Sequence, residues 1–205
     1  MVRTALGTTI LGLALFVCAA GIGSDEKTPP PDKPAATHPG FEKLKQLAGE
    51  WVEVAEPGGE KEAKGEKAGK EAKEEKGEKE AKMEAGQLTA IYKVTSAGSA
   101  VMETLFPGTP HEMVTMYHLD GPDLMLTHYC AAGNQPRMKL EKSDDPSKLV
   151  FKFSGGTNMD PTKDAHMHDL TITFIDNDHF RSEWTSYDDG KKSGVHTFEM
   201  KRKKA

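Results

Sequence analysis

A period-two alternation of apolar and polar residues is the feature that most constrains this fold. It runs through residues 38–55 and 86–205, about 138 of the 205 residues. Residues typical of turns interrupt the alternation about every 8–12 residues, a pattern typical of all-β sandwiches and barrels. Ten strands are predicted, at 50–55, 87–95, 99–106, 111–119, 124–131, 137–142, 148–154, 165–175, 179–187 and 191–202.

The short connections between these strands predict how the sheet is arranged. Strands joined by a few turn residues pair as antiparallel neighbours. An open sheet of ten such strands would expose two edges, and closing it into a barrel removes both. Phe41, Leu44 and Leu47 have helical spacing just before the first strand. The sequence therefore predicts an all-β chain, a ten-stranded antiparallel up-and-down barrel with a short N-terminal helix.

The passage from this helix into the first strand carries a family resemblance. A short helix followed by Gly49-Glu50-Trp51 resembles the calycin group, which includes lipocalins, fatty-acid-binding proteins and nitrobindin-like domains. Segments 127–130 (THYC) and 133–138 (GNQPRM) are similar to exported bacterial lipocalin-like proteins. The resemblance implies that Trp51 closes one end of a barrel spanning residues 38–205.

The first 23 residues have the form of a secretory signal peptide. Arg3 precedes an uncharged, mostly apolar stretch at 5–17, and the small residues 18–20 follow it. Thirteen helical residues rise only about 20 Å, too little to cross a membrane. We expect an exported protein, periplasmic or extracellular, with no integral membrane span after cleavage. An alternative is lipoprotein anchoring at Cys18, although Val17 departs from the usual small residue before the cysteine.

Two further segments lack the composition of a folded core. Residues 24–37 are rich in proline and predict an extended linker. Residues 57–86 form a Lys/Glu-rich insert, with lysine at every third position from 61 to 82. This period matches neither a helix nor a strand, and the insert is predicted to be disordered. The alternative is an interaction arm. The overall net charge of −5 offers no basic surface for nucleic acid.

Alternation along each predicted strand indicates which side chains line the barrel interior. The inward set is mostly aliphatic and aromatic, which favours a binding protein that holds a small apolar or amphipathic molecule in its lumen. The side chains expected to contact this ligand are Trp184, Phe151, Phe153, Cys130 and His196.

Histidines suggest a second function. His166 and His168 are two residues apart on one predicted strand, so their side chains are expected on the same face. An up-and-down topology brings His128 to the same end of the barrel. Three imidazoles can bind zinc and leave a position open for water. The alternative function is therefore a metal-binding protein or a metal-dependent enzyme, with Cys130 or Asp164 as substitute ligands. No motif assigns catalytic residues.

Overall fold

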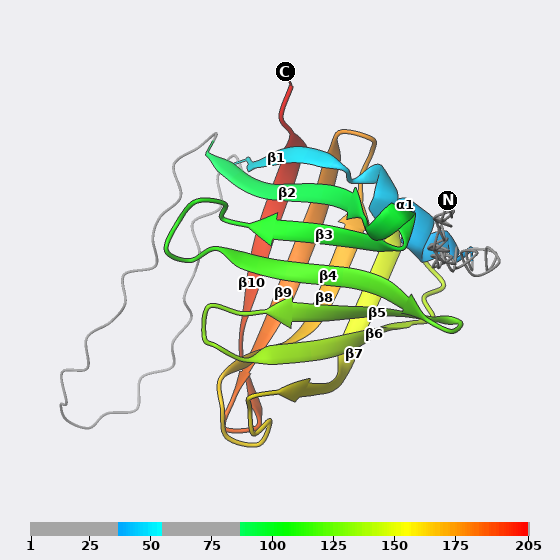
Figure 1. Cartoon of the computed structure of the whole chain (residues 1–205). Coiled ribbons are helices and arrows are strands. Elements are labelled where there is room, and N and C mark those ends of the chain that lie inside the picture. The colour runs from blue at the N-terminus through cyan, green and yellow to red at the C-terminus, as the bar shows by residue number, and fades with distance from the viewer. Residues whose placement is uncertain (1–36, 55–86, 205) are drawn as a thin grey trace, which may run out of the picture. The chain divides into compact units, whose positions relative to one another are not determined.

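The computed structural model describes residues 37–54 and 87–204, and within these ranges the predicted fold is confirmed. Ten antiparallel strands close into one barrel in the order β1-β10-β9-β8-β7-β6-β5-β4-β3-β2 (Figure 1). The elements are α1 (Pro39–Gln46), β1 (Gly49–Glu53), β2 (Leu88–Thr95), a 3₁₀ turn η1 (Ser96–Gly98), β3 (Ala100–Leu105), β4 (Met113–Asp120), β5 (Asp123–Tyr129), β6 (Gln135–Glu141), β7 (Lys148–Thr157), β8 (His166–Phe174), β9 (His179–Asp188) and β10 (Lys191–Arg202).

Helix α1 begins at the residues that favour a helix start. The His38 side chain accepts a hydrogen bond from the Gly40 N–H at 3.1 Å, and Pro39 occupies the first turn, where its missing N–H costs nothing. The predicted apolar stripe of Phe41, Leu44 and Leu47 is buried. This stripe packs into the barrel core, so α1 covers the end at which β1 begins (Figure 1). We call it the closed end.

Trp51 is buried at the closed end, 1% exposed. Its indole N–H donates to the Leu47 carbonyl at 2.7 Å, and its ring meets the edge of the Phe180 ring at 4.7 Å between centroids. The Arg202 guanidinium lies over the Trp51 ring, 4.3 Å from the ring centroid. Trp51 thus links α1, β1, β9 and β10.

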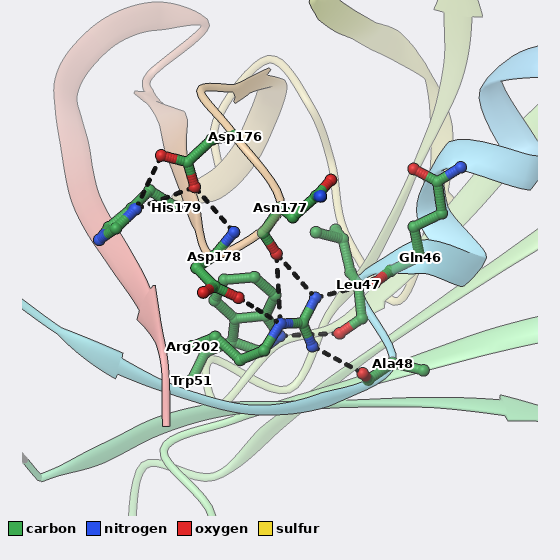
Figure 2. A network of polar contacts seen from close by, with 9 residues as sticks. All are labelled: Gln46, Leu47, Ala48, Trp51, Asp176, Asn177, Asp178, His179 and Arg202. Atoms are coloured by element: carbon green, nitrogen blue, oxygen red, sulfur yellow. Dashed lines mark hydrogen bonds and ion pairs between the residues drawn. The ribbon is translucent and has the colours of Figure 1, made fainter. Parts of the chain in front are cut away.

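Arg202 completes the closed end with hydrogen bonds to backbone carbonyls (Figure 2). It donates to Gln46 and Ala48 at 3.0 and 2.9 Å, and to Asn177 in the β8–β9 turn at 3.1 and 3.2 Å. The last carbonyls of a helix have no partner within the helix. The Arg202 side chain, at the end of β10, therefore supplies donors to carbonyls at the end of α1 and links the helix to the β8–β9 turn.

One strand boundary differs from the prediction. Residues 155–164 are predicted as a loop, but β7 continues to Thr157, where it pairs with Gln135. The register shifts between Arg137 and Met138, and Gly155 takes a φ of +130°, which glycine adopts without a Cβ clash. The extra residue is Ser154 on β7, and the bulge formed with the adjacent glycine lets both strands extend beyond the predicted turn.

Several sequence predictions concern residues that the structure does not describe. The signal peptide at 1–23, the linker up to residue 36 and the insert at 57–86 all lie outside the described ranges, so these stay predictions. Among the helices that are described, none has the length and apolar character needed to cross a membrane.

Candidate functional site

A row of polar side chains crosses four neighbouring strands inside the barrel. Tyr92 on β2 lies opposite Glu103 on β3, Glu103 lies opposite Thr115 on β4, and Thr115 lies opposite His128 on β5. Residues directly opposite in an antiparallel pair share a face of the sheet. All four side chains are buried, so the row lies on the inner face.

Glu103 is the centre of this row and is 1% exposed. The hydroxyls of Tyr92 and Tyr117 donate to its two carboxyl oxygens at 2.5 and 2.8 Å. Burial raises the pKa of the Glu103 carboxyl above its ordinary value, while the hydrogen bonds from Tyr92 and Tyr117 act in the opposite direction. The carboxyl group is thus buried but well supplied with donors.

His128 ends the row and faces the middle of the barrel. Its Nδ1 lies 3.0 Å from the Thr115 hydroxyl oxygen, and its ring lies 4.7 Å from the Trp184 ring between centroids. Burial lowers the pKa of His128 to about 4, so the imidazole is neutral at pH 7. Its second nitrogen, Nε2, finds no hydrogen-bond partner among the described residues.

Two polar groups of β9 share this lack of a partner. The Ser182 hydroxyl and the Trp184 indole N–H are buried and unpartnered within the described ranges. They lie two residues apart, on one face of the strand. Strands β5 and β9 are not neighbours in the barrel, so the contact between His128 and Trp184 bridges the lumen.

Apolar side chains that are only partly buried lie at the other end of the barrel, which we call the open end. β1 ends and β2 begins there, as Figure 1 shows. The Phe106 and Phe198 rings contact each other there at 5.8 Å between centroids, and Phe198 lies opposite Ser182 in the β9–β10 pair. Met113 and Met167 also pack against the core while staying half-exposed. Apolar surface therefore separates the unpartnered polar groups from solvent.

The five predicted ligand contacts occupy different surroundings. Trp184 and Phe151 are buried in the core. Cys130 is a half-buried free thiol whose Sγ lies 3.9 Å from the Met113 Sδ. Phe153 is half-buried and stacks on a histidine, as described below, and His196 lies opposite Trp184 but is exposed. The structure brings only Trp184 to the unpartnered His128.

A bulge interrupts the alternation that was predicted to place His166 and His168 on one face with Leu170, while His166 itself is buried. The β8–β9 register shifts between Met167 and Asp169, so His168 is the extra residue of a bulge. A bulge reverses the alternation beyond it, and Met167 packs against the core instead.

The three predicted zinc ligands are thereby separated into two groups. The His168 ring stacks between Phe153 and Tyr187 at 4.7 and 3.8 Å, and the His166 ring lies 5.5 Å from it. His128 contacts Thr115 and Trp184. Within residues 37–54 and 87–204 no group of three or more His, Cys, Asp or Glu side chains is placed to hold a metal ion.

No family model matches the chain, and a search of curated proteins also finds no match. The fold therefore stands on the structure alone. A closed ten-stranded antiparallel barrel is consistent with the calycin resemblance but is not specific to it. Any function must be argued from the side chains of this chain.

The polar row was not found by sequence reasoning. Strands 99–106 and 111–119 are apolar on both faces, and alternation alone does not sort them. One usable signal was present. Val101, Glu103 and Leu105 are two residues apart on one predicted strand, so they share a face, and the two apolar residues are buried. A lone carboxylate between two core positions indicates a buried acid with dedicated hydrogen-bond donors.

The lowered pKa of His128 makes a prediction about acid stability. Because the folded-state pKa of about 4 lies below the ordinary 6.5, the fold favours the neutral ring. The neutral His128 ring therefore adds to the free energy of unfolding above pH 6.5. Up to about 3 kcal/mol of this stability is lost as the pH falls towards 4. We expect His128→Gln to lose less unfolding free energy than the wild type between pH 7 and pH 4.

Urea denaturation at both pH values measures this difference. Because its pKa is raised, Glu103 stabilises the fold as the pH falls, which is opposite to the effect of His128. Glu103 is present in both proteins, so the comparison isolates His128. Equal acid losses in the two proteins would contradict the prediction.

Proposed function

We propose that this chain is an exported binding protein that holds a small amphipathic molecule at the open end of its barrel. The proposal rests on three of the five buried polar atoms that have no partner among the described residues: His128 Nε2, Ser182 Oγ and Trp184 Nε1. Leaving such an atom unpaired costs about 1–3 kcal/mol, and folded proteins leave few of them. A polar group of a bound molecule would supply the missing partners.

The side chains above these atoms support an amphipathic ligand. Phe106, Phe198, Met113 and Met167 are partly exposed at the open end, whereas the core below is filled by large buried side chains such as Tyr117 and Phe151. A ligand would place its polar group beside His128 and Trp184 and its apolar part against these four residues. Export is supported by the signal-like segment at 1–23.

Two hollows in the described part of the chain lie elsewhere. One is lined by the β6–β7 hairpin, and the other lies beside α1 and the β8–β9 turn. Neither is lined by His128, Ser182 or Trp184. The proposal therefore places the ligand between side chains that part to admit it, with Met113 and Met167 as the most adaptable.

A pair of matched phenylalanine variants tests the location. Phe198 lies at the open end and Phe174 at the closed end, and both are half-buried against the core. Using the fluorescent amphiphile anilinonaphthalene sulfonate, we expect Phe198→Ala to weaken binding about tenfold, because it removes apolar contact worth about 1.4 kcal/mol.

Phe174→Ala serves as the control and is expected to leave the probe affinity within about twofold of the wild type. Trp184 reports on the same event, because its fluorescence should change when the probe binds. Failure of the folded wild type to bind the probe, or a larger loss from Phe174→Ala than from Phe198→Ala, would overturn the proposal.

A further inference from the structure

Strand β10 has a strand neighbour on only one side for most of its length. It pairs with β9 along nearly all of its residues, but with β1 only at its last three positions, Met200–Arg202. The seam to β1 ends where the Val54 N–H donates to the Glu199 carbonyl at 2.9 Å. Figure 1 shows β10 running on past the short strand β1. Among the described residues, none pairs as a strand with residues 191–198 on that side, and we call this stretch the free edge.

The alternation of the backbone decides which groups the free edge offers. Successive residues of an antiparallel strand direct their N–H and C=O groups to opposite sides. The Glu199 carbonyl faces β1, and the β9–β10 register shifts only between Lys192 and Gly194. The backbone groups of Thr197 and Val195 therefore face the same side as those of Glu199. Each of these two residues offers one donor and one acceptor to a further strand.

The side chains of the free edge are exposed on both faces of the strand. Every residue from Lys191 to Thr197 is exposed except Gly194, which is half-buried. Val195 is the large apolar side chain among them and is 46% exposed. Lysines and a bulge protect an edge from pairing, but here they occupy only the end next to the β9–β10 turn, at Lys191 to Gly194. The remainder is a template for another strand.

We propose that the free edge pairs with the free edge of a second copy of this chain, antiparallel about a two-fold axis beside Val195. The length of the edge sets this position. Val54 already fills the place opposite Glu199, and the β9–β10 turn ends the edge before Lys191. The middle of the free edge therefore lies next to Val195. The Val195 N–H of each copy donates to the Val195 carbonyl of the other, and the two valine side chains cover each other.

Symmetry and charge favour a second copy as the occupant. A two-fold axis uses the same surface on both copies and makes the two strands antiparallel, as β10 already is with β9. The free edge carries Lys191 and Lys192 at one end, and Glu199, which also pairs with Arg181 of β9, lies at the other. Antiparallel pairing of identical edges brings the lysine end of each copy to the glutamate end of the other. A parallel pair would bring like charges together.

Val195→Pro tests this contact while leaving the ladder between β9 and β10 in place. Proline removes the Val195 N–H, which faces the free side, and edge strands tolerate proline at such positions. We expect sedimentation velocity of the purified full chain to show a monomer–dimer equilibrium. Val195→Pro is expected to weaken the dimer by at least about tenfold, because the substitution removes a donor from both copies.

Val195→Thr is the matched control, because it keeps both the N–H and a β-branched side chain. Its dimer affinity is expected to stay within about threefold of the wild type, a difference well below 1.4 kcal/mol. A wild type that stays monomeric throughout the accessible concentration range leaves the edge to a different partner and overturns the proposal. A dimer that is equally tight in Val195→Pro forms through another surface and also overturns it.

Hydrogen exchange of the wild type tests the same edge without a substitution. We expect the Val195 and Thr197 amides to exchange quickly in dilute protein and to become protected as the concentration rises. The His196 and Phe198 amides face β9 and serve as internal controls that are protected at every concentration. Protection of Val195 and Thr197 already in dilute protein would mean that the same chain covers the edge. That result, or no protection at high concentration, overturns the proposal.

Discussion

Trp51→Ala is expected to lower the free energy of unfolding by about 3–5 kcal/mol, as for other large aromatic side chains removed from a core. Trp51 is buried at the closed end, where it contacts Phe180, hydrogen-bonds to Leu47 and lies under Arg202. Alanine would leave a cavity beneath α1 and remove the surface on which the guanidinium rests. Denaturant unfolding followed by circular dichroism measures the change.

Trp51→Phe is the matched control for this substitution. Phenylalanine keeps an aromatic ring against Phe180 and Arg202 but loses the indole hydrogen bond to the Leu47 carbonyl. We expect a loss well below that of Trp51→Ala, because less volume is removed. Equal losses in the two variants would mean that the hydrogen bond, rather than the packing, holds the closed end together.

Glu103→Ala is expected to be similarly damaging, with a loss of about 3–5 kcal/mol. The substitution leaves the hydroxyls of Tyr92 and Tyr117 buried without their common acceptor, and each unpaired group costs about 1–3 kcal/mol. Urea denaturation at pH 7 measures the loss.

An apolar replacement of the whole cluster separates hydrogen bonding from volume. The triple variant Tyr92→Phe/Glu103→Met/Tyr117→Phe keeps the side-chain volume but removes the carboxyl group together with two of its donors. Replacing all partners of a buried network by apolar groups is often close to neutral. We therefore expect the triple variant to be more stable than Glu103→Ala, and the opposite order would contradict the account of the cluster.

The tyrosine pair also explains why a carboxylate is tolerated at this depth. Burial raises the pKa of both Tyr92 and Tyr117 well above 10, so both hydroxyls keep their protons at neutral pH. Each can therefore donate to Glu103 throughout the ordinary pH range. The cluster is fixed by three strands that are adjacent in the barrel, β2, β3 and β4.

Local sequence patterns were sufficient for the architecture. Period-two alternation and turn residues act over a few neighbours, and they predicted all ten strands, their order and the helix stripe of Phe41, Leu44 and Leu47. The alternation of side chains along single strands also placed Leu126, Phe151 and Trp184 correctly inside, because no bulge interrupts their own strands at these residues.

The site depended on features that act across the barrel. The bulge at His168 interrupts the alternation between His166 and Leu170, and nothing in the sequence of that strand marks it. Glu103, Thr115 and His128 come together only because three strands align in one register. The sequence by itself determined the ten-stranded barrel, since alternation and turns are local. Only the tertiary structure decided which polar groups meet inside it, because register and bulges are set by pairing between strands.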